Sequence, residues 1–269
     1  MSTLSNLDIE KEIGINICIY PFSRKNLRGA SYNLTASKLA WNIETKQSIY
    51  DSQSGKLVIP RQSSVLIETN ESIWVSTRIS GTYHSKVALV SKGLSHIGTT
   101  LDPEYVGSSL IAIHNHSNQE VNLTPEIDTF ATLIFHYMKS EASVKPGNDP
   151  GRPDILRGYQ VSQEEEAWLD QDFRKITDRL KTKMQESKDF QEIVEHRKSL
   201  KIKMGSGMVY IALCSLIILT ILAYGVLASK KTSLSSQEWY DPMMNALSGA
   251  TVAVPTALFT KWLSDIGKN

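Results

Sequence analysis

One segment constrains this chain more than any other. The run from Met208 to Ala228 contains no charged residue and extends the apolar stretch that opens at Gly207. At a rise of about 1.5 Å per residue, a helix of this length crosses the roughly 30 Å of hydrocarbon in a bilayer. The sequence therefore predicts a transmembrane span at 207–228. We expect a membrane-bound protein, located at the cell inner membrane.

A second, weaker apolar stretch, 243–263, contains a single charge at Lys261 together with several small and polar residues. Three readings stay open for it: an interfacial helix, a lipid-facing second span, or a pore-lining helix. At helical spacing the polar positions fall near one face, which suits a pore because that face would meet water. The pore-lining positions predicted on this reading are Asn245, Ser248, Val252 and Thr256.

Basic residues flank the first span unevenly. Four lie between 197 and 203, and two follow the span, Lys230 and Lys231. The positive-inside rule then places the N-terminal domain in the cytoplasm. The first residues also lack the basic start and apolar stretch of a secretory signal. Cys18 and Cys214 are the only cysteines, so a disulfide framework is not expected and a reducing compartment fits.

The segment 13–160 is a series of short apolar and β-branched runs separated by clusters of Gly, Pro, Asn and Ser. This pattern predicts an all-β sandwich or barrel, and the lack of alternating helical patterns argues against a parallel dinucleotide-binding sheet. The chain carries 29 Lys+Arg against 28 Asp+Glu and is 41% hydrophobic. That balance excludes whole-chain disorder and a polybasic coat for nucleic acid.

From Ser162 onward the pattern is helical. Ser162 and Glu165 have the spacing of a capping box, and apolar residues then recur every three or four positions from Leu169 to Met184. Two readings stay open: a solvated helix packed on its own domain, or a helical stalk that pairs with copies of itself. We expect three parts: a β domain at 1–160, a stalk at 161–204 and a membrane module at 205–269.

Several phrases of the β domain occur in a familiar order. They are GASYNL from Gly29, IPRQSSVLIETNESIWV from Ile59, SKVALVSKGL from Ser85, LDPEYVG from Leu101 followed by SLIAIHN, and ATLIF from Ala131. Over residues 14–160 the chain resembles the dCTP deaminase and dUTP pyrophosphatase superfamily. The resemblance implies a distorted jelly-roll, dUTPase-like, and a homo-oligomer, expected to be a trimer with a tetramer as the alternative.

The resemblance also implies a deoxynucleotide pocket at a subunit interface. In pyrophosphatases of the family the hairpin Asp contacts the sugar and orients a water, and the Tyr ring packs against C2′ of deoxyribose. Asp102 and Tyr105 occupy those places here. A carboxylate accepts a hydrogen bond from a 3′-hydroxyl, and an aromatic wall discriminates by shape. The plain alternative is that Asp102 opens a turn before Pro103 and Tyr105 packs beneath it.

Three positions depart from the family pattern. Ala112 stands where deaminases use a Glu as general acid and base, and a methyl group cannot shuttle a proton. Lys86 opens Lys-Val-Ala where relatives have an Arg-Ser phosphate grip, and neutral Asn33 replaces an Asp that helps to hold magnesium. These departures predict a domain that binds a nucleotide without turning it over. We therefore expect no catalytic residue, no bound metal and no cofactor, and we expect that the protein is not an enzyme.

Phosphate binding is expected from the residues around the Lys-Val-Ala segment that replaces the family's phosphate-binding motif. It is also expected from a tail that resembles the deaminase C-terminal element, which closes over the ligand in relatives. The alternative for the basic residues among them is plain solvated surface. With Asp102 and Tyr105, the predicted ligand-binding set is completed by Ser85, Lys86, Arg152, Arg157, Tyr159 and Gln160. His114 and His116 share one strand face, but a metal site is not expected because no Asp or Cys stands at ligand spacing.

Together these features favour a ligand-gated membrane effector, an ion channel or membrane-disrupting protein. Its ligand would be a deoxynucleotide or short single-stranded DNA bound to the degenerate domain. Bacterial antiviral systems contain membrane effectors of this kind, and by analogy with them we expect a role in antiviral defence. The alternatives are a membrane-anchored hydrolase of dUTP or dCTP, with Asp102 still positioning a water, and an anchored structural receptor.

Overall fold

The structure is a computed structural model and describes residues 2–96, 98–147, 149–229, 237, 240–249 and 256, without the side chains of 200–214, 216, 217 and 220. The strands are β1 (Ser2–Thr3), β2 (Ile17–Tyr20), β3 (Leu27–Arg28), β4 (Ser31–Asn42), β5 (Tyr50–Asp51), β6 (Lys56–Ile59), β7 (Ser63–Val75), β8 (Ile79–Ser85), β9 (Leu94–Ser95), β10 (Thr100–Leu101), β11 (Val106–Asn115), β12 (Val121–Leu123) and β13 (Thr129–Tyr137). The α-helices are α1 (Asn6–Glu12), α2 (Val87–Val90), α3 (Pro153–Leu156), α4 (Gln163–Leu169), α5 (Thr177–Gln185) and α6 (Lys188–Ser229), and the 3-10 helices are η1 (Arg24–Asn26) and η2 (Asp172–Arg174).

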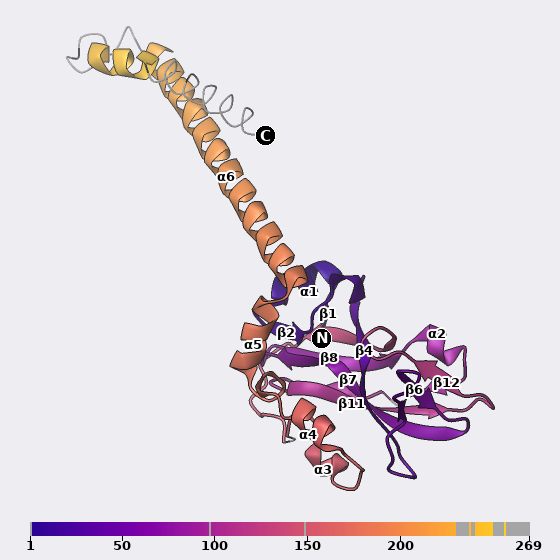
Figure 1. Ribbon diagram of the computed structural model, residues 1–269. Coiled ribbons are helices and arrows are strands. Elements are labelled where there is room, and N and C mark those ends of the chain that lie inside the picture. The colour runs from indigo at the N-terminus through magenta and orange to yellow at the C-terminus, as the bar shows by residue number, and fades with distance from the viewer. Residues whose placement is uncertain are drawn as a thin grey trace. The chain divides into compact units, whose positions relative to one another are not determined.

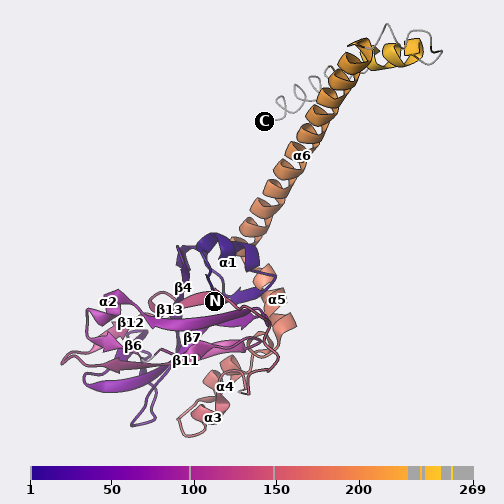
Figure 2. The same cartoon turned by 180° about the vertical axis from the view of Figure 1, so that it is seen from behind.

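The strands form two antiparallel sheets, so the predicted mainly β domain is confirmed. The larger sheet has the order β10-β8-β13-β4-β7-β11-β9, with β1 paired to β13, β2 to β7 and β3 to β4. The smaller sheet has the order β12-β6-β5. In both views α2, β6 and β12 lie together at one end of the β domain (Figure 1, Figure 2).

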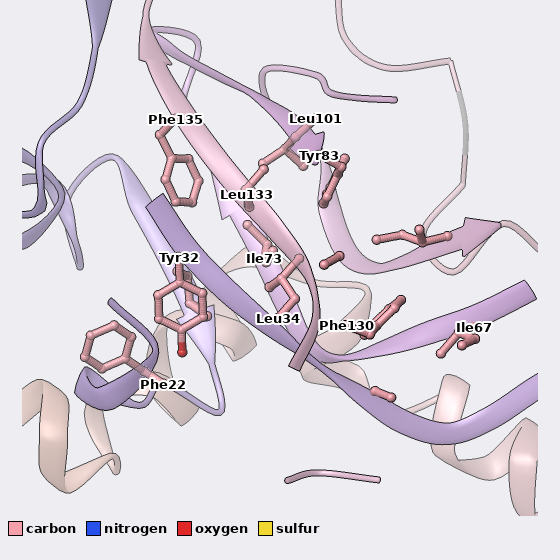
Figure 3. Packing of buried hydrophobic residues seen from close by; sticks show 14 of the residues in the cluster. Phe22, Tyr32, Leu34, Ile67, Ile73, Tyr83, Leu101, Phe130, Leu133 and Phe135 are labelled. Carbon is pink, nitrogen blue, oxygen red and sulfur yellow. The ribbon is translucent and has the colours of Figure 1, made fainter. Parts of the chain in front are cut away.

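The centre of the larger sheet is β7, which pairs with β2, β4 and β11. Its apolar residues at alternate positions, among them Val65, Ile67 and Ile73, are fully buried, as period-two spacing requires of a strand with one face on the core. Figure 3 shows Ile67 and Ile73 among side chains from β4, β8 and β13. One continuous core therefore joins strands that are far apart in the sequence.

The helical region after Val161 begins as predicted. Ser162 and Glu165 form a capping box at the start of α4. The single amphipathic helix expected from there is wrong: the chain is divided into α4, η2, α5 and α6. The physical reason is that the apolar residues turn onto the sheet, where Leu180 and Met184 are buried in the main core and the backbone N–H of Ile19 donates to Met184 Sδ at 3.4 Å.

Helix α5 contacts β2 in this core. The start of α6 joins it, because Phe190 packs so close to Gly14 that a Cβ there would lie 2.7 Å from the ring. Gly14 also has a φ of +81°, which favours glycine. Residues 1–195 thus form one compact unit, and 196–269 form a second. The boundaries predicted at 160 and 204 stay predictions, with the contacts favouring helices packed on their own domain.

The predicted membrane span is not supported. Within the described part of the chain, no helix is both long enough and apolar enough to cross a bilayer. In the second unit, Tyr240 is buried and its hydroxyl donates to the Leu227 carbonyl at 3.0 Å.

The pore roles predicted for the second apolar stretch are not tested. Asn245 and Ser248 are exposed within the helical residues 240–249, and Thr256 is exposed as well. Val252 lies outside the described residues. The second span at 243–263 has no support among the residues described.

Candidate functional site

Three residues of the LDPEYVG hairpin, Leu101, Asp102 and Tyr105, line a pocket of about 230 Å³ that is also lined by residues of β8 and β11. Three predicted ligand-binding residues, Asp102, Tyr105 and Arg152, meet there although Arg152 comes from the segment before α3. The remaining lining residues are Tyr83, Thr99, Thr100, Leu101, Ser109, Leu110 and Pro146. Tyr83 and Leu101 can be followed side by side in Figure 3.

Asp102 and Tyr105 are held by a turn directly after β10. The N–H of Tyr105 donates to the Asp102 carbonyl at 3.2 Å, and Thr100 Oγ1 donates to the Asp102 carboxylate at 3.3 Å. The Asp102 side chain is exposed, whereas Tyr105 is half-buried and its hydroxyl donates to the Ser108 carbonyl. Burial raises the pKa of Tyr105 above its usual range, so this phenol stays protonated. The Tyr ring is thereby fixed as a wall, and the exposed Asp102 carboxylate can accept a further hydrogen bond.

The floor of the pocket is a bulge in β11. The register of β11 against β7 shifts between Ser108 and Leu110. The Ser109 N–H donates to Thr69 Oγ1 at 2.8 Å, and the Ser109 hydroxyl lies 2.5 Å from the Tyr83 hydroxyl. Bulges re-aim side chains next to functional sites. Here the bulge turns the Ser109 hydroxyl toward the pocket.

Arg152 supplies the positive charge of the pocket. It has a left-handed backbone, with a φ of +49°, and its guanidinium binds the Asp154 carboxylate through two hydrogen bonds, at 2.9 and 2.8 Å. The bonds to Asp154 raise the pKa of Arg152 further, and those from Arg152 lower the pKa of Asp154. The guanidinium therefore stays charged, and a phosphate in the pocket would compete with Asp154 for it.

The structure does not bring the other predicted residues into this pocket. Ser85 ends β8, with its hydroxyl 2.7 Å from His96 Nδ1, and Lys86 follows it. Partial burial and the nearby Arg28 charge lower the pKa of Lys86. Arg157 lines a separate pocket of about 400 Å³ between the α3 and α4 segments.

The end of the predicted tail lies against β4 instead. Lys46 Nζ donates to the Tyr159 hydroxyl at 3.1 Å, and Trp41 Nε1 donates to the Gln160 carbonyl at 3.1 Å. Tyr159 also packs edge-on against the Trp41 ring. In this chain the tail is thus docked on its own sheet.

The three departures from the family pattern have clear structural positions. Ala112 lies in β11, paired with Leu66 of β7. Asn33 is buried, and its Oδ1 accepts a hydrogen bond from Thr132 Oγ1 at 3.0 Å. This amide is already engaged and neutral, so it does not fit the role of a magnesium partner. Among the described residues, no cluster of three or more His, Cys, Asp or Glu side chains is suited to a metal ion.

The sequence analysis missed three buried ionisable side chains on β7 and η2. Glu68 and Glu71 of β7 and Arg174 of η2 are all nearly inaccessible to solvent. Burial raises the pKa of both carboxyls to about 7 and lowers that of Arg174 to about 10. Glu and Arg side chains are rarely buried fully unless they are paired. The one available signal was the placement of Glu68 and Glu71 inside one long strand, between the apolar runs 65–67 and 73–75.

Comparisons with known proteins agree with the sequence resemblance. A family model described as dCTP deaminase-like matches residues 3–137. The dCTP deaminase of Thermococcus sibiricus is 30% identical over 151 residues, which cover 56% of this chain and 91% of that protein. The dCTP deaminase of Pyrococcus abyssi is 32% identical over 139 residues, which cover 52% and 86%.

Two solved structures are also similar. The dCTP deaminase of Agrobacterium tumefaciens has a TM-score of 0.42 at 10% identity, over 51% of this chain and 48% of that one. The EIAV dUTPase has a TM-score of 0.35 at 19% identity, over 49% and 96%.

These findings correct two predictions. The expectation that the chain is not an enzyme is contradicted. The relatives that it matches over most of their length are dCTP deaminases. The predicted inner-membrane location is contradicted too, because among the described residues no helix is long and apolar enough to cross a bilayer. The resemblance to the dCTP deaminase and dUTP pyrophosphatase superfamily is confirmed. The chain belongs to the dCTP deaminase-like family.

Proposed function

We propose that this chain binds a pyrimidine deoxynucleoside triphosphate in the pocket of Asp102, Tyr105 and Arg152, and hydrolyses its phosphate chain. One observation carries the proposal: a carboxylate, a fixed aromatic wall and a guanidinium from two distant segments line the same pocket. Its relatives are dCTP deaminases, which act on a ligand of this class.

Each residue has a distinct role in this proposal. The Tyr105 ring packs on the sugar and disfavours a 2′-hydroxyl, because its own hydroxyl is tied to Ser108 and the ring cannot turn away. The Asp102 carboxylate accepts the 3′-hydroxyl or a water. Arg152 exchanges its bonds to Asp154 for bonds to a phosphate oxygen, which is the acceptor geometry that a guanidinium fits.

Hydrolysis is favoured over deamination by the residue at position 112. Deamination of cytosine needs a group that carries protons to and from the ring, and the Ala112 methyl cannot do so. Hydrolysis needs a positioned water instead. Its oxygen attacks the α-phosphorus, the bond to the bridging oxygen breaks, pyrophosphate leaves, and the water proton passes to solvent by way of Asp102.

Purified protein incubated with dUTP and with dCTP tests the proposal, with pyrophosphate and ammonia measured separately. We expect pyrophosphate release without ammonia, and loss of it in Asp102→Asn. Asp178→Asn, an exposed position on α5, is the matched control and should keep full activity. Ammonia release would establish deamination instead. If neither product forms and neither nucleotide binds, the proposal is wrong.

A further inference from the structure

The carboxyl of Glu68 lies directly behind the wall of this pocket. Glu68 pairs with Leu110 of β11, and Leu66 pairs with Ala112, so Glu68 shares a sheet face with both β11 residues. Its side chain is 0% exposed, and neither carboxyl oxygen has a hydrogen-bond partner. A buried carboxyl without partners is costly when ionised.

The groups that face Glu68 do not neutralise it by a direct pair. Ser108 of β11 lowers the pKa of Glu68, but the Ser108 hydroxyl forms no hydrogen bond with either carboxyl oxygen. Arg174 of η2 is attracted to Glu68 and Glu71, yet its guanidinium bonds to the Asn70 carbonyl and to Ser72 Oγ. Its guanidinium also stacks 3.2 Å from the Trp168 ring centre. Arg174 thus lowers the pKa of Glu68 through its charge, but it forms no hydrogen bond with the Glu68 oxygens.

Glu68 interacts electrostatically with two tyrosines that line the pocket. The Glu68 charge raises the pKa of Tyr83 and of Tyr105, after the larger effect of burial, and both rings line the pocket. Leu110, its direct neighbour across the strands, lines it as well. The residue paired with Glu68 and two rings that its charge influences therefore line the pocket, in a buried region of low dielectric where charges interact strongly.

We propose that Glu68 couples nucleotide binding to the uptake of one proton, so that the pocket accepts its polyanionic ligand with Glu68 neutral. The coupling rests on the proposed nucleotide site. A phosphate chain near the pocket adds negative charge and excludes water, and both effects favour the protonated carboxyl. Because burial already places the pKa of Glu68 at about 7, the effect falls in the neutral range.

The sign of the pH dependence follows from this. Below pH 7 Glu68 is mainly protonated in the free protein, and binding changes little. Above pH 7 the ligand must recruit a proton, so its affinity falls by up to about tenfold per pH unit. Arg152 stays charged throughout this range, because its bonds to Asp154 raise its pKa, and it does not produce the slope.

Glu71 provides a matched control because it is buried equally but is satisfied. Its carboxylate accepts bonds from the Thr35 N–H and from the Thr35 hydroxyl, between 2.9 and 3.2 Å. Its charge raises the pKa of Tyr32, on the core side, and it is not among the influences on Tyr83 or Tyr105. The bonds to Thr35 hold the Glu71 carboxylate toward β4.

The experiment is calorimetric titration of the full chain with the slowly hydrolysed analogue dUpNHpp, in buffers of different ionisation enthalpy and from pH 6 to 8.5. Proton uptake by wild type is compared with Glu68→Gln and Glu71→Gln, and the ligand's own titration is common to all three. We expect Glu68→Gln to take up about one proton fewer and to bind about tenfold more tightly than wild type at pH 8. Glu71→Gln should keep the wild-type proton uptake.

Glu68→Leu, which removes the charge and the polar atoms together, repeats the test if the Gln variant does not fold. Equal proton uptake in wild type and both Glu68 variants overturns the inference while leaving the proposed function intact. If wild type binds dUpNHpp at no pH, the nucleotide site itself is wrong, and the proton coupling falls with it.

Discussion

At the scale of single residues, the ring and the hydroxyl of Tyr105 have separate roles. The ring lines the pocket, and the hydroxyl donates to Ser108 at the bulge. We expect Tyr105→Ala to weaken nucleotide binding by about 1–3 kcal/mol, the usual value of stacking on an aromatic ring. Tyr105→Phe keeps the wall and should lose only about 1 kcal/mol of stability.

Calorimetric titration and urea unfolding of both variants separate these effects. A Phe variant that binds as weakly as the Ala variant would show that the hydroxyl, and not the ring, contacts the ligand.

The ionisation of Glu68 should also be visible in the stability of the free protein. Its pKa in the fold, about 7, is raised above the ordinary value of 4.5, so the folded state prefers the protonated form. Stability from this group is complete below pH 4.5 and is lost as the pH rises to 7, by about 3 kcal/mol in total. Glu68→Gln removes this loss.

Urea unfolding at pH 5 and pH 8 measures the effect. The stability of Glu68→Gln relative to wild type should rise between the two pH values, whereas that of the exposed Glu44→Gln should not. A constant difference between Glu68→Gln and wild type would show that Glu68 ionises normally in the fold.

Sequence reasoning at this scale succeeded where the contacts are local. Asp102 and Tyr105 belong to one turn, so their approach follows from the motif itself. The positions of Tyr159 and Gln160 depend on Trp41 and Lys46, which are distant in the chain, and no local pattern indicates them. Glu68 escaped notice because its strand position was readable but the cover over that face, supplied by η2, was not.

At the scale of elements, the β-strands followed from apolar runs and turn residues, since their core faces are buried wherever the alternation is regular. The helical region was harder to anticipate. The spacing of Leu180 and Met184 indicated a helix but not which surface would receive it. The long apolar run of α6 favoured a membrane span by its lack of charge, and this expectation is not supported by the described helices.

The packing of α5 on β2 gives an element-scale prediction. Leu180 is 0% exposed in the main core, so Leu180→Ala should lower the free energy of unfolding by about 2–5 kcal/mol. The neighbouring exposed residue Arg179 serves as control, and Arg179→Ala should change it little. Thermal or urea unfolding followed by circular dichroism measures both. Equal stability of the two variants would mean that α5 is separate from the β domain.

At the scale of the whole molecule, one chain does not assemble all of the expected ligand residues. Asp102, Tyr105 and Arg152 line one pocket, while Ser85 and Lys86 lie elsewhere on the same chain. The family resemblance implied a homo-oligomer with its pocket at a subunit interface. If neighbouring copies complete the site, Lys86 of one subunit serves the Asp102 pocket of the next.

Complementation between inactive variants tests this arrangement. Asp102→Asn and Lys86→Ala each remove one half of a shared site, so mixed oligomers restore an intact pair at about one site in four when the chains exchange freely. We expect unfolded and refolded mixtures of these two variants to regain about that share of wild-type pyrophosphate release. Asp102→Asn mixed with Tyr105→Ala is the control, because both changes fall in the same pocket of one chain and no intact site can form unless that pocket is itself divided. Recovery in the first mixture alone would establish a site shared between subunits. Equal failure of both mixtures, with oligomers verified by light scattering, would place the complete site within a single chain.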